Sequence, residues 1–440
     1  MIKNIINKLL GTFLILLLLS VESSLQTSIA LDRSLALWTV WLYKLGSLTI
    51  ADIGIILISL YVLINVFLSL SKNQQIWTSS PYLGLCYLAV VYLFIGFLYN
   101  LFVFTNWKTF FYDIKAIIYL TVPYLFLYFC KSQQLRKWFN YKNIFIFLGL
   151  SGIIDFVIVS LLNTSEYPSF LGLPSFPSIV PLSVAIPGVI YTKNKLYKRL
   201  LLLLILLEII FNINRLSLGS LYNSAILIIS CILIVTSHLN FPQRFLAILG
   251  LILFINFTSV FMINNPFEFS MLEAKSEGAI TRKIQMENAL LNFNENIPGI
   301  IGKGLGSTWF EYIPIPSGDI YSVGTSLGET AEDSLSSSVK FIFNWTPPVL
   351  IHKWGILGSI SIVFLVTKFL HSSISNIERV KSINKYDKYN DLLYPLLIIT
   401  LIFIIENFTF IGILKSSLIT SMLAFELEKN FSFKKLEKPM

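Results

Sequence analysis

A glycine-rich stretch that contains one lysine has the residue types needed to bind an anion. It spans residues 296–309, NIPGIIGKGLGSTW, and includes Gly299, Gly302, Lys303, Gly304 and Gly306. Glycines let successive backbone N–H groups turn toward one anion, and the lysine adds positive charge. The stretch lacks the Gly-Lys-Ser/Thr ending of a nucleotide-binding P-loop. Two interpretations stay open: a phosphate-binding loop, or a tight turn that packs on the membrane face of the protein.

Two arginines are candidates for the same chemistry. Arg215 lies in NINRLSLGS at the end of an apolar run, and Arg282 lies at the start of a predicted amphipathic helix over residues 280–296. The planar guanidinium group binds phosphate and pyrophosphate oxygens with two parallel hydrogen bonds. The alternatives are an interfacial side chain for Arg215 and a solvated loop charge for Arg282.

The cysteines indicate no metal site. Cys86, Cys130 and Cys231 fall inside apolar runs and lack Cys-x-x-Cys spacing. This placement is typical of small buried apolar residues.

The elements that must position these residues are membrane-spanning helices. The chain of 440 residues is 55% hydrophobic and 13% charged, which is roughly half the charged fraction of a soluble domain. Uncharged runs of about 18 or more residues are typical of membrane spans. The sequence predicts an all-α polytopic membrane protein, a single membrane domain over residues 1–440 with about twelve transmembrane helices. The predicted spans are 5–22, 47–70, 80–104, 114–130, 143–163, 178–192, 200–213, 219–237, 245–264, 347–369, 391–406 and 409–426.

The positions of basic residues predict the orientation of these helices. Lysines and arginines gather at both termini and in alternate loops, such as 131–142 and 193–199. Because cytoplasmic loops retain basic residues, both termini are predicted to be cytoplasmic. The long hydrophilic segment 265–346, between the ninth and tenth helices, then forms an extracytoplasmic loop that contains the glycine-rich stretch. The net charge of +9 reflects this topology and attraction to anionic lipids, and it does not indicate nucleic-acid binding.

Charged residues within or beside the predicted spans cluster toward the outer side. They are Asp52, Asp155, Glu208, Glu406 and Lys415. Taken singly, each is best interpreted as part of a structural ion pair. Taken together, they predict a polar cavity open to the outside, as a lipid-linked anionic substrate requires.

Three segments resemble motifs of the O-antigen ligase and O-antigen polymerase superfamily of bacterial membrane glycosyltransferases. Residues 214–233, NRLSLGSLYNSAILIISCIL, resemble its arginine-containing opening of the eighth span. Residues 281–307, TRKIQMENALLNFNENIPGIIGKGLGS, resemble its large outer loop, in which an arginine, a helix and a proline precede spaced glycines. Residues 353–366, KWGILGSISIVFLV, resemble the Gly-Ile/Leu-x-Gly start of the next span. The predicted topology also agrees with the family.

The resemblance implies a GT-C-like fold and a metal-independent reaction that needs no cofactor. Such enzymes transfer a glycan from an undecaprenyl pyrophosphate carrier to a hydroxyl acceptor at the outer face of the bacterial cytoplasmic membrane. The pyrophosphate-binding arginines carry over to Arg215 and Arg282, and Lys303 is expected to assist them. Fixed positive charge of this kind stabilises a leaving pyrophosphate. The expected partners are the lipid-linked glycan, membrane lipids and a glycan or lipid acceptor, and a chain-length regulator is a candidate partner.

The sequence departs from the family at the expected general base. The family commonly has a histidine eleven residues before the Gly-Ile/Leu-x-Gly pattern, and here that position is Asn344. His352, three residues before Gly355, is the candidate catalytic residue in its place. The alternatives are a packing role for His352, or a carboxylate base in the segment GETAEDS, 328–334.

A transporter or flippase for a glycolipid or a small anion is the alternative function. Carriers of this kind favour inverted repeats and a site near the middle of the membrane. The sequence shows no internal repeat, and its charged residues cluster away from the midplane. The sequence therefore favours the enzyme. The choice between a polymerase and a ligase stays open because nothing in the chain identifies the acceptor.

Overall fold

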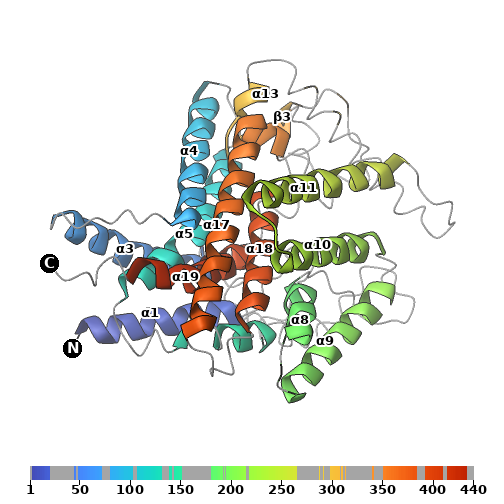
Figure 1. The fold of residues 1–440 in the computed structure, drawn as a ribbon. Helices are drawn as coiled ribbons and strands as arrows, with labels where there is room; N and C mark the ends of the chain where they lie inside the picture. The colour runs from blue at the N-terminus through green and yellow to red at the C-terminus, as the bar shows by residue number, and fades with distance from the viewer. Residues whose placement is uncertain are drawn as a thin grey trace.

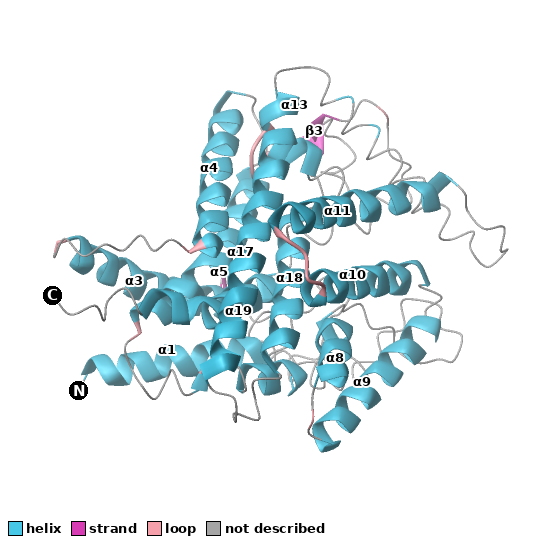
Figure 2. Ribbon diagram, viewed as in Figure 1, coloured by secondary structure: helices cyan, strands magenta, loops and turns pink. Residues whose placement is uncertain are grey.

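The computed structural model describes residues 2–19, 44–45, 48–71, 80–102, 107–130, 138–140, 143–150, 180–191, 193, 195–214, 218–264, 287, 291, 298–307, 309–310, 313, 339–340, 350–383, 392–409 and 414–433. These residues are almost entirely helical, apart from turns and two ribbons of short strands (Figure 2). The all-α class is therefore confirmed for the part of the chain that the structure describes.

The helices follow the colour gradient of Figure 1 along the chain. They are α1 (Ile2–Leu19), α3 (Ile50–Leu70), α4 (Pro81–Phe102), α5 (Trp107–Phe129), α8 (Val180–Tyr191), α9 (Lys195–Asn214), α10 (Leu218–Thr236), α11 (Phe241–Asn264), α13 (Pro298–Ile301), the π-helical turn η3 (Leu350–Trp354), α17 (Gly355–Ile383), α18 (Leu393–Thr409) and α19 (Leu414–Phe433). The antiparallel ribbons pair β1 (Lys44–Leu45) with β2 (Leu48–Thr49), and β3 (Trp309–Phe310) with β4 (Val339–Lys340).

Each of the twelve predicted spans overlaps a helical stretch, and the fifth, 143–163, is helical over its described residues 143–150. Within the described residues, three stretches are long and apolar enough to cross a membrane: Ile50–Ser69, Pro81–Phe102 and His352–Ser382. These stretches support the membrane-protein class. The number of twelve spans and the GT-C-like arrangement stay predictions.

Helices α18 and α19 form the centre of the assembly. Every side chain over residues 395–405 and 416–428 is buried. Around this centre, α5 packs against α3, α4 and α19, and α17 packs against α4, α11 and α18. In Figure 1, α4 and α17 run up and down the view whereas α10 and α11 run across it. The helices therefore do not form one parallel bundle.

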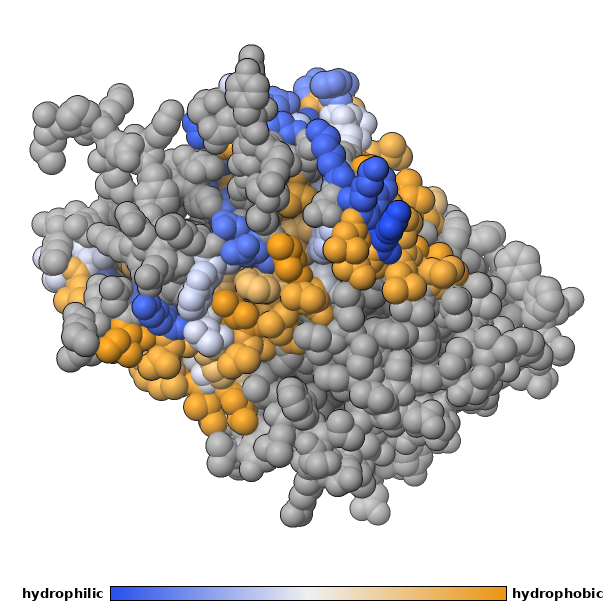
Figure 3. Space-filling view, turned by 90° about the horizontal axis from the view of Figure 1, so that it is seen from below, coloured by the Kyte–Doolittle hydropathy of each residue, from blue (hydrophilic) through white to orange (hydrophobic). Residues whose placement is uncertain are grey.

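Helices α3 and α4 turn large apolar side chains outward. Phe67, Phe94 and Phe102 are 70%, 61% and 85% exposed. On the face seen from below, apolar side chains cover much of the described surface, with hydrophilic residues between them (Figure 3). An exposed apolar surface of this extent marks contact with another apolar phase. For helices long enough to span a bilayer, that phase is lipid.

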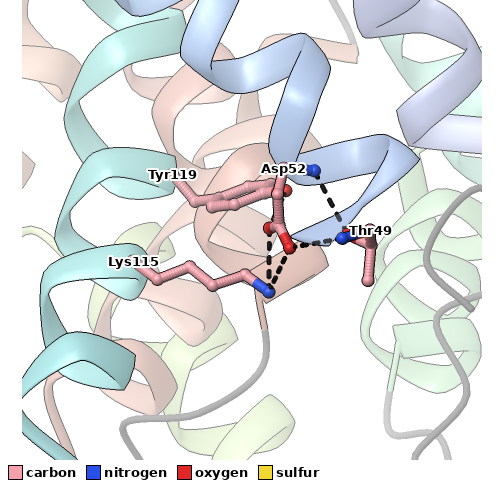
Figure 4. Close-up of polar contacts among 4 residues, drawn as sticks. All are labelled: Thr49, Asp52, Lys115 and Tyr119. Carbon is pink, nitrogen blue, oxygen red and sulfur yellow. Dashed lines mark hydrogen bonds and ion pairs between the residues drawn. The ribbon is translucent and has the colours of Figure 1, made fainter. Parts of the chain in front are cut away.

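An ion pair joins the start of α3 to α5 (Figure 4). Lys115 Nζ lies 2.8 Å from one carboxylate oxygen of Asp52 and 2.9 Å from the other, and the Tyr119 hydroxyl donates to Asp52 at 3.1 Å. Asp52 also closes a capping box with the N-cap residue Thr49, which satisfies two backbone N–H groups at the helix start. The interpretation of Asp52 as part of a structural ion pair is thus confirmed.

Contacts between distant segments join residues that the sequence places on the same side of the membrane. Asp52 and Lys115 are both predicted near the outer side, and they pair. Arg244 and His371 are both predicted on the cytoplasmic side, and the Nη1 atom of Arg244 lies 3.0 Å from Nδ1 of His371. Each of these contacts thus joins two residues predicted on one side of the membrane, and the topology itself stays a prediction.

Candidate functional site

The glycine-rich stretch folds into a short helix and a buried turn. Residues 298–301 form α13, and residues 302–307, here termed the glycine turn, are all buried. The turn lies against the middle of α4 and against η3, through contacts with Tyr92, Gly96, His352 and Lys353. A segment of the predicted outer loop thus inserts between two of the three candidate membrane-spanning stretches.

Glycine is required where this turn meets α4. Gly304 has a φ of +85°, a left-handed conformation that residues with a Cβ atom rarely adopt. A Cβ on Gly304 would lie 2.1 Å from the backbone nitrogen of Gly96, and a Cβ on Gly96 would lie 1.6 Å from the carbonyl oxygen of Leu305. The two backbones therefore touch directly, and only glycine on both sides permits that approach.

The backbone N–H groups of residues 303–306 all donate to protein acceptors. The acceptors, in chain order, are the carbonyl oxygens of His352 (2.8 Å), Lys353 (3.0 Å) and Tyr92 (2.8 Å), and a carboxylate oxygen of Asp113 (2.6 Å). In this conformation the four amides are not available to an anion. The packed-turn interpretation of the glycines therefore matches the geometry, and the amide-cradle interpretation does not.

The turn reaches below the predicted outer end of α4. Gly96 lies six residues before Phe102, where α4 ends, which is about 9 Å along the axis at a rise of ~1.5 Å per residue. Non-helical backbone at membrane depth is tolerated only where protein buries it or where it lines a cavity. Protein buries it here, since residues 302–307 have little exposed surface.

The start of α17 is irregular at the same level. The π-helical turn η3 ends at Trp354, and Gly355 follows with a φ of +61°. The Trp354 ring packs on Tyr92 of α4, with ring centroids 4.8 Å apart. Single π-helical turns are rare and frequently occur at functional sites.

Four ionisable side chains gather around the glycine turn. Lys353 Nζ forms a salt bridge of 2.6 Å with Asp113 of α5, and their side chains are 3% and 2% exposed. Lys303 is buried, with Nζ 5.4 Å from the centre of the Tyr99 ring, a geometry in which the ring face attracts the cation. His352 is 4% exposed, so its ring is accessible only from within the protein. The site thus combines two ammonium groups, an imidazole and one carboxylate.

The structure brings together most of the sequence-predicted site residues that it describes. Lys303 and His352 are joined by a backbone hydrogen bond, and the glycines at 299, 302, 304 and 306 lie in α13 and the adjoining turn. Arg215 and Arg282 lie outside the described residues, as do Asn344 and the segment 328–334.

Sequence reasoning missed Asp113 and Lys353, the buried ion pair of this site. Asp113 directly precedes the predicted span 114–130, and Lys353 opens the segment 353–366. Charges at span ends are common, so neither position is conspicuous. The signals that could have found them are weak. Asp113 lies one residue before a predicted span, and Lys353 adjoins the ionisable His352. Both residues are on the side predicted to face outward.

The described residues offer no metal site, because they contain no group of three or more histidine, cysteine, aspartate or glutamate side chains close enough to hold a metal ion. The arrangement instead suits the binding of an anion and the movement of a proton. Lysine ammonium groups offset negative charge, and histidine is the side chain that most readily exchanges protons between pH 5 and pH 8. No protein-family model matches the chain, and no curated protein matches it either.

Proposed function

We propose that this protein is a bacterial membrane glycosyltransferase of the O-antigen polymerase or ligase type. It transfers a glycan from an undecaprenyl pyrophosphate carrier to a hydroxyl acceptor at the outer face of the cytoplasmic membrane, with both termini in the cytoplasm. The reaction uses neither a metal nor a cofactor.

The observation that carries the proposal is the contact between two of the three family-like segments. The backbone N–H of Gly304 in the segment 281–307 donates to the carbonyl oxygen of Lys353, the first residue of the segment 353–366, and the N–H of Lys303 donates to His352, one residue before that segment. If the two segments resembled the family motifs only by chance, nothing would require them to lie in contact in the structure. Their meeting gathers a lysine and a histidine of the proposed site in one buried region.

Each group has a proposed role that suits its chemistry. Arg215, Arg282 and Lys303 bind the pyrophosphate and offset the charge that develops on it as the glycosidic bond breaks. His352 removes the proton from the acceptor hydroxyl, a step that requires its ring within hydrogen-bonding reach of that oxygen. The glycine turn sets the distance between Lys303 and His352. The roles of the two arginines rest on the resemblance.

Deletion of the gene tests the proposal. Surface polysaccharide is separated on a gel, and undecaprenyl-linked intermediates are profiled by mass spectrometry in the same strain. Single lipid-linked repeat units without long chains indicate a polymerase, and lipid-linked long chains without their final acceptor indicate a ligase. Unchanged polysaccharide together with unchanged intermediates would overturn the proposal and favour a transporter.

A further inference from the structure

We infer that Asp113 is the positioning residue of the glycine turn. Its carboxylate fixes Gly306 and Lys353 relative to α5. As a consequence, the nearby residues Lys303 and His352 keep fixed positions relative to each other. The positioning of the glycine turn by Asp113 does not depend on the proposed function, whereas its effect on glycan transfer rests on that function.

One oxygen atom of Asp113 serves both segments of the site. The backbone N–H of Gly306 and the Nζ of Lys353 each donate to Oδ2 of Asp113 at 2.6 Å. Asp113 belongs to α5, Gly306 to the glycine turn and Lys353 to η3. A single buried carboxylate thus links three segments that are far apart in the sequence. Charge-assisted hydrogen bonds of this length are among the stronger ones in proteins.

The Gly306 residue is held from two sides. Its N–H donates to Asp113, and its carbonyl oxygen accepts from Nδ2 of Asn100 in α4 at 3.1 Å. A Cβ on Gly306 would lie 2.6 Å from the Cα of Phe110, one turn before Asp113. The backbone of α5 therefore lies directly against the turn. Loss of the Asp113 charge weakens the acceptor on the α5 side and leaves the ammonium of Lys353 buried without its counter-charge.

A second ion pair on the same helix provides a matched control. Lys115 of α5 pairs with Asp52 of α3 at 2.8 Å, two residues from Asp113. The Lys115 side chain is 31% exposed, and the described partners of this pair lie in α3, α5 and β2 and not in the glycine turn. Removal of either carboxylate breaks an ion pair of α5, but only the change at Asp113 also affects a contact with the glycine turn.

The test measures access to the glycine turn in the purified full-length protein. Ser307→Cys places a thiol at a fully buried position of the turn, and the native cysteines Cys86, Cys130 and Cys231 are buried. The rate of maleimide labelling at position 307 in the otherwise wild-type protein is compared with the rate in three variant backgrounds. They are Asp113→Asn, the control Asp52→Asn, and the charge-swapped double variant Asp113→Lys with Lys353→Asp. Thermal unfolding in detergent and the amount of polysaccharide formed in cells, without the reporter cysteine, are measured in parallel.

The charge-swapped variant separates positioning from general stabilisation. It restores an ion pair between positions 113 and 353, but a lysine at 113 cannot accept from the N–H of Gly306. We expect labelling to be at least tenfold faster in Asp113→Asn and in the swapped variant, with wild-type labelling in Asp52→Asn. We expect the amount of polysaccharide to fall at least tenfold in Asp113→Asn and in the swapped variant.

If the swapped variant labels as slowly as the wild type and makes as much polysaccharide, the pair is only structural and the inference is overturned. If Asp113→Asn fails to fold, the labelling rate of the swapped variant alone decides whether Asp113 positions the glycine turn or only forms a structural ion pair. If the wild-type gene has no effect on glycans, the proposed function fails, and the labelling rates still decide whether Asp113 positions the turn.

Discussion

The backbone N–H of Leu305 donates to the carbonyl oxygen of Tyr92 at 2.8 Å, which joins the glycine turn to α4 near the middle of that helix. A helix carbonyl has two lone pairs and accepts a second donor without loss of its own helical bond. The approach is possible because residue 96 of α4 is glycine. The turn is therefore part of the packed helical structure and not a surface excursion.

Replacement of Gly304 tests this packing. Gly304→Ala forces a Cβ into a left-handed backbone conformation, which costs about 1–2 kcal/mol, and into contact with the backbone of α4. We expect the midpoint of thermal unfolding in detergent to fall by several degrees, with polysaccharide formation sharply reduced and membrane insertion intact. Gly304→Val acts in the same direction and more strongly.

Gly250→Ala is the control for that experiment. Gly250 lies in α11, and an added Cβ there has no neighbour within 4 Å. Alanine is favoured over glycine in a helix by about 1 kcal/mol, so the control unfolds at the wild-type temperature or above it. Equal unfolding temperatures for Gly304→Ala and the wild type would contradict the close approach of the glycine turn to α4.

His352 is tested by replacement with glutamine, which has a similar size but cannot take a proton at neutral pH. A general base contributes about 10²–10⁴-fold to a rate, so His352→Gln is expected to lower the transfer rate at least 100-fold while the protein still folds. The measurement is polymer formation by purified protein from a lipid-linked glycan. His238→Gln, a change two residues after α10 ends, serves as the control. A wild-type rate in His352→Gln assigns the base elsewhere, with the segment 328–334 as the next candidate.

The positions of the helices are predictable from the sequence, but their contacts are not. Each apolar run is long enough to favour a helix in lipid, and that pattern is local. The bond from Asn100 to Gly306 joins residues 206 apart, and the Lys353–Asp113 bond joins residues 240 apart. Nothing in a hydropathy pattern says which distant residues meet.

The glycines show why the candidate site was only partly predictable. A cluster of glycines is expected both for an anion-binding loop, where amides face a ligand, and for close packing, where two backbones touch. The sequence Gly-Lys-Gly is the same in either case. Only the acceptors of the amides of residues 303–306 distinguish the two, and those acceptors come from α4, α5 and η3.

Arg282 is tested by a change that keeps its charge. Lysine offers a point charge, whereas the arginine fork binds two oxygens of a pyrophosphate at once. We therefore expect Arg282→Lys to lose most polymer formation, with normal protein levels in the membrane. The matched change Arg199→Lys, in the first turns of α9 at the end predicted to be cytoplasmic, should leave polymer formation unchanged. Full activity of Arg282→Lys would remove this arginine from the proposed pyrophosphate site.

Glu428, in α19 and two residues beyond the predicted span 409–426, is expected to make the free energy of unfolding depend on pH. Burial raises the pKa of its carboxyl group to about 7 from 4.5, although three hydrogen bonds act in the opposite direction. The donors are the Ser80 hydroxyl, the Tyr124 hydroxyl at 2.8 Å and the Tyr82 amide at 3.2 Å. The folded protein thus keeps this proton up to about pH 7, whereas the unfolded chain loses it near 4.5.

Between these two pH values the folded state binds more protons than the unfolded state, so the free energy of unfolding falls as pH rises. One pKa unit corresponds to about 1.36 kcal/mol, and the whole interval is therefore worth roughly 3 kcal/mol. The contribution is complete below pH 4.5 and is lost by about pH 7. Glu428→Gln keeps an oxygen acceptor but cannot ionise, so its unfolding temperature should vary less between pH 5 and pH 8 than that of the wild type. Parallel pH profiles for the two proteins would mean that Glu428 does not titrate in this interval.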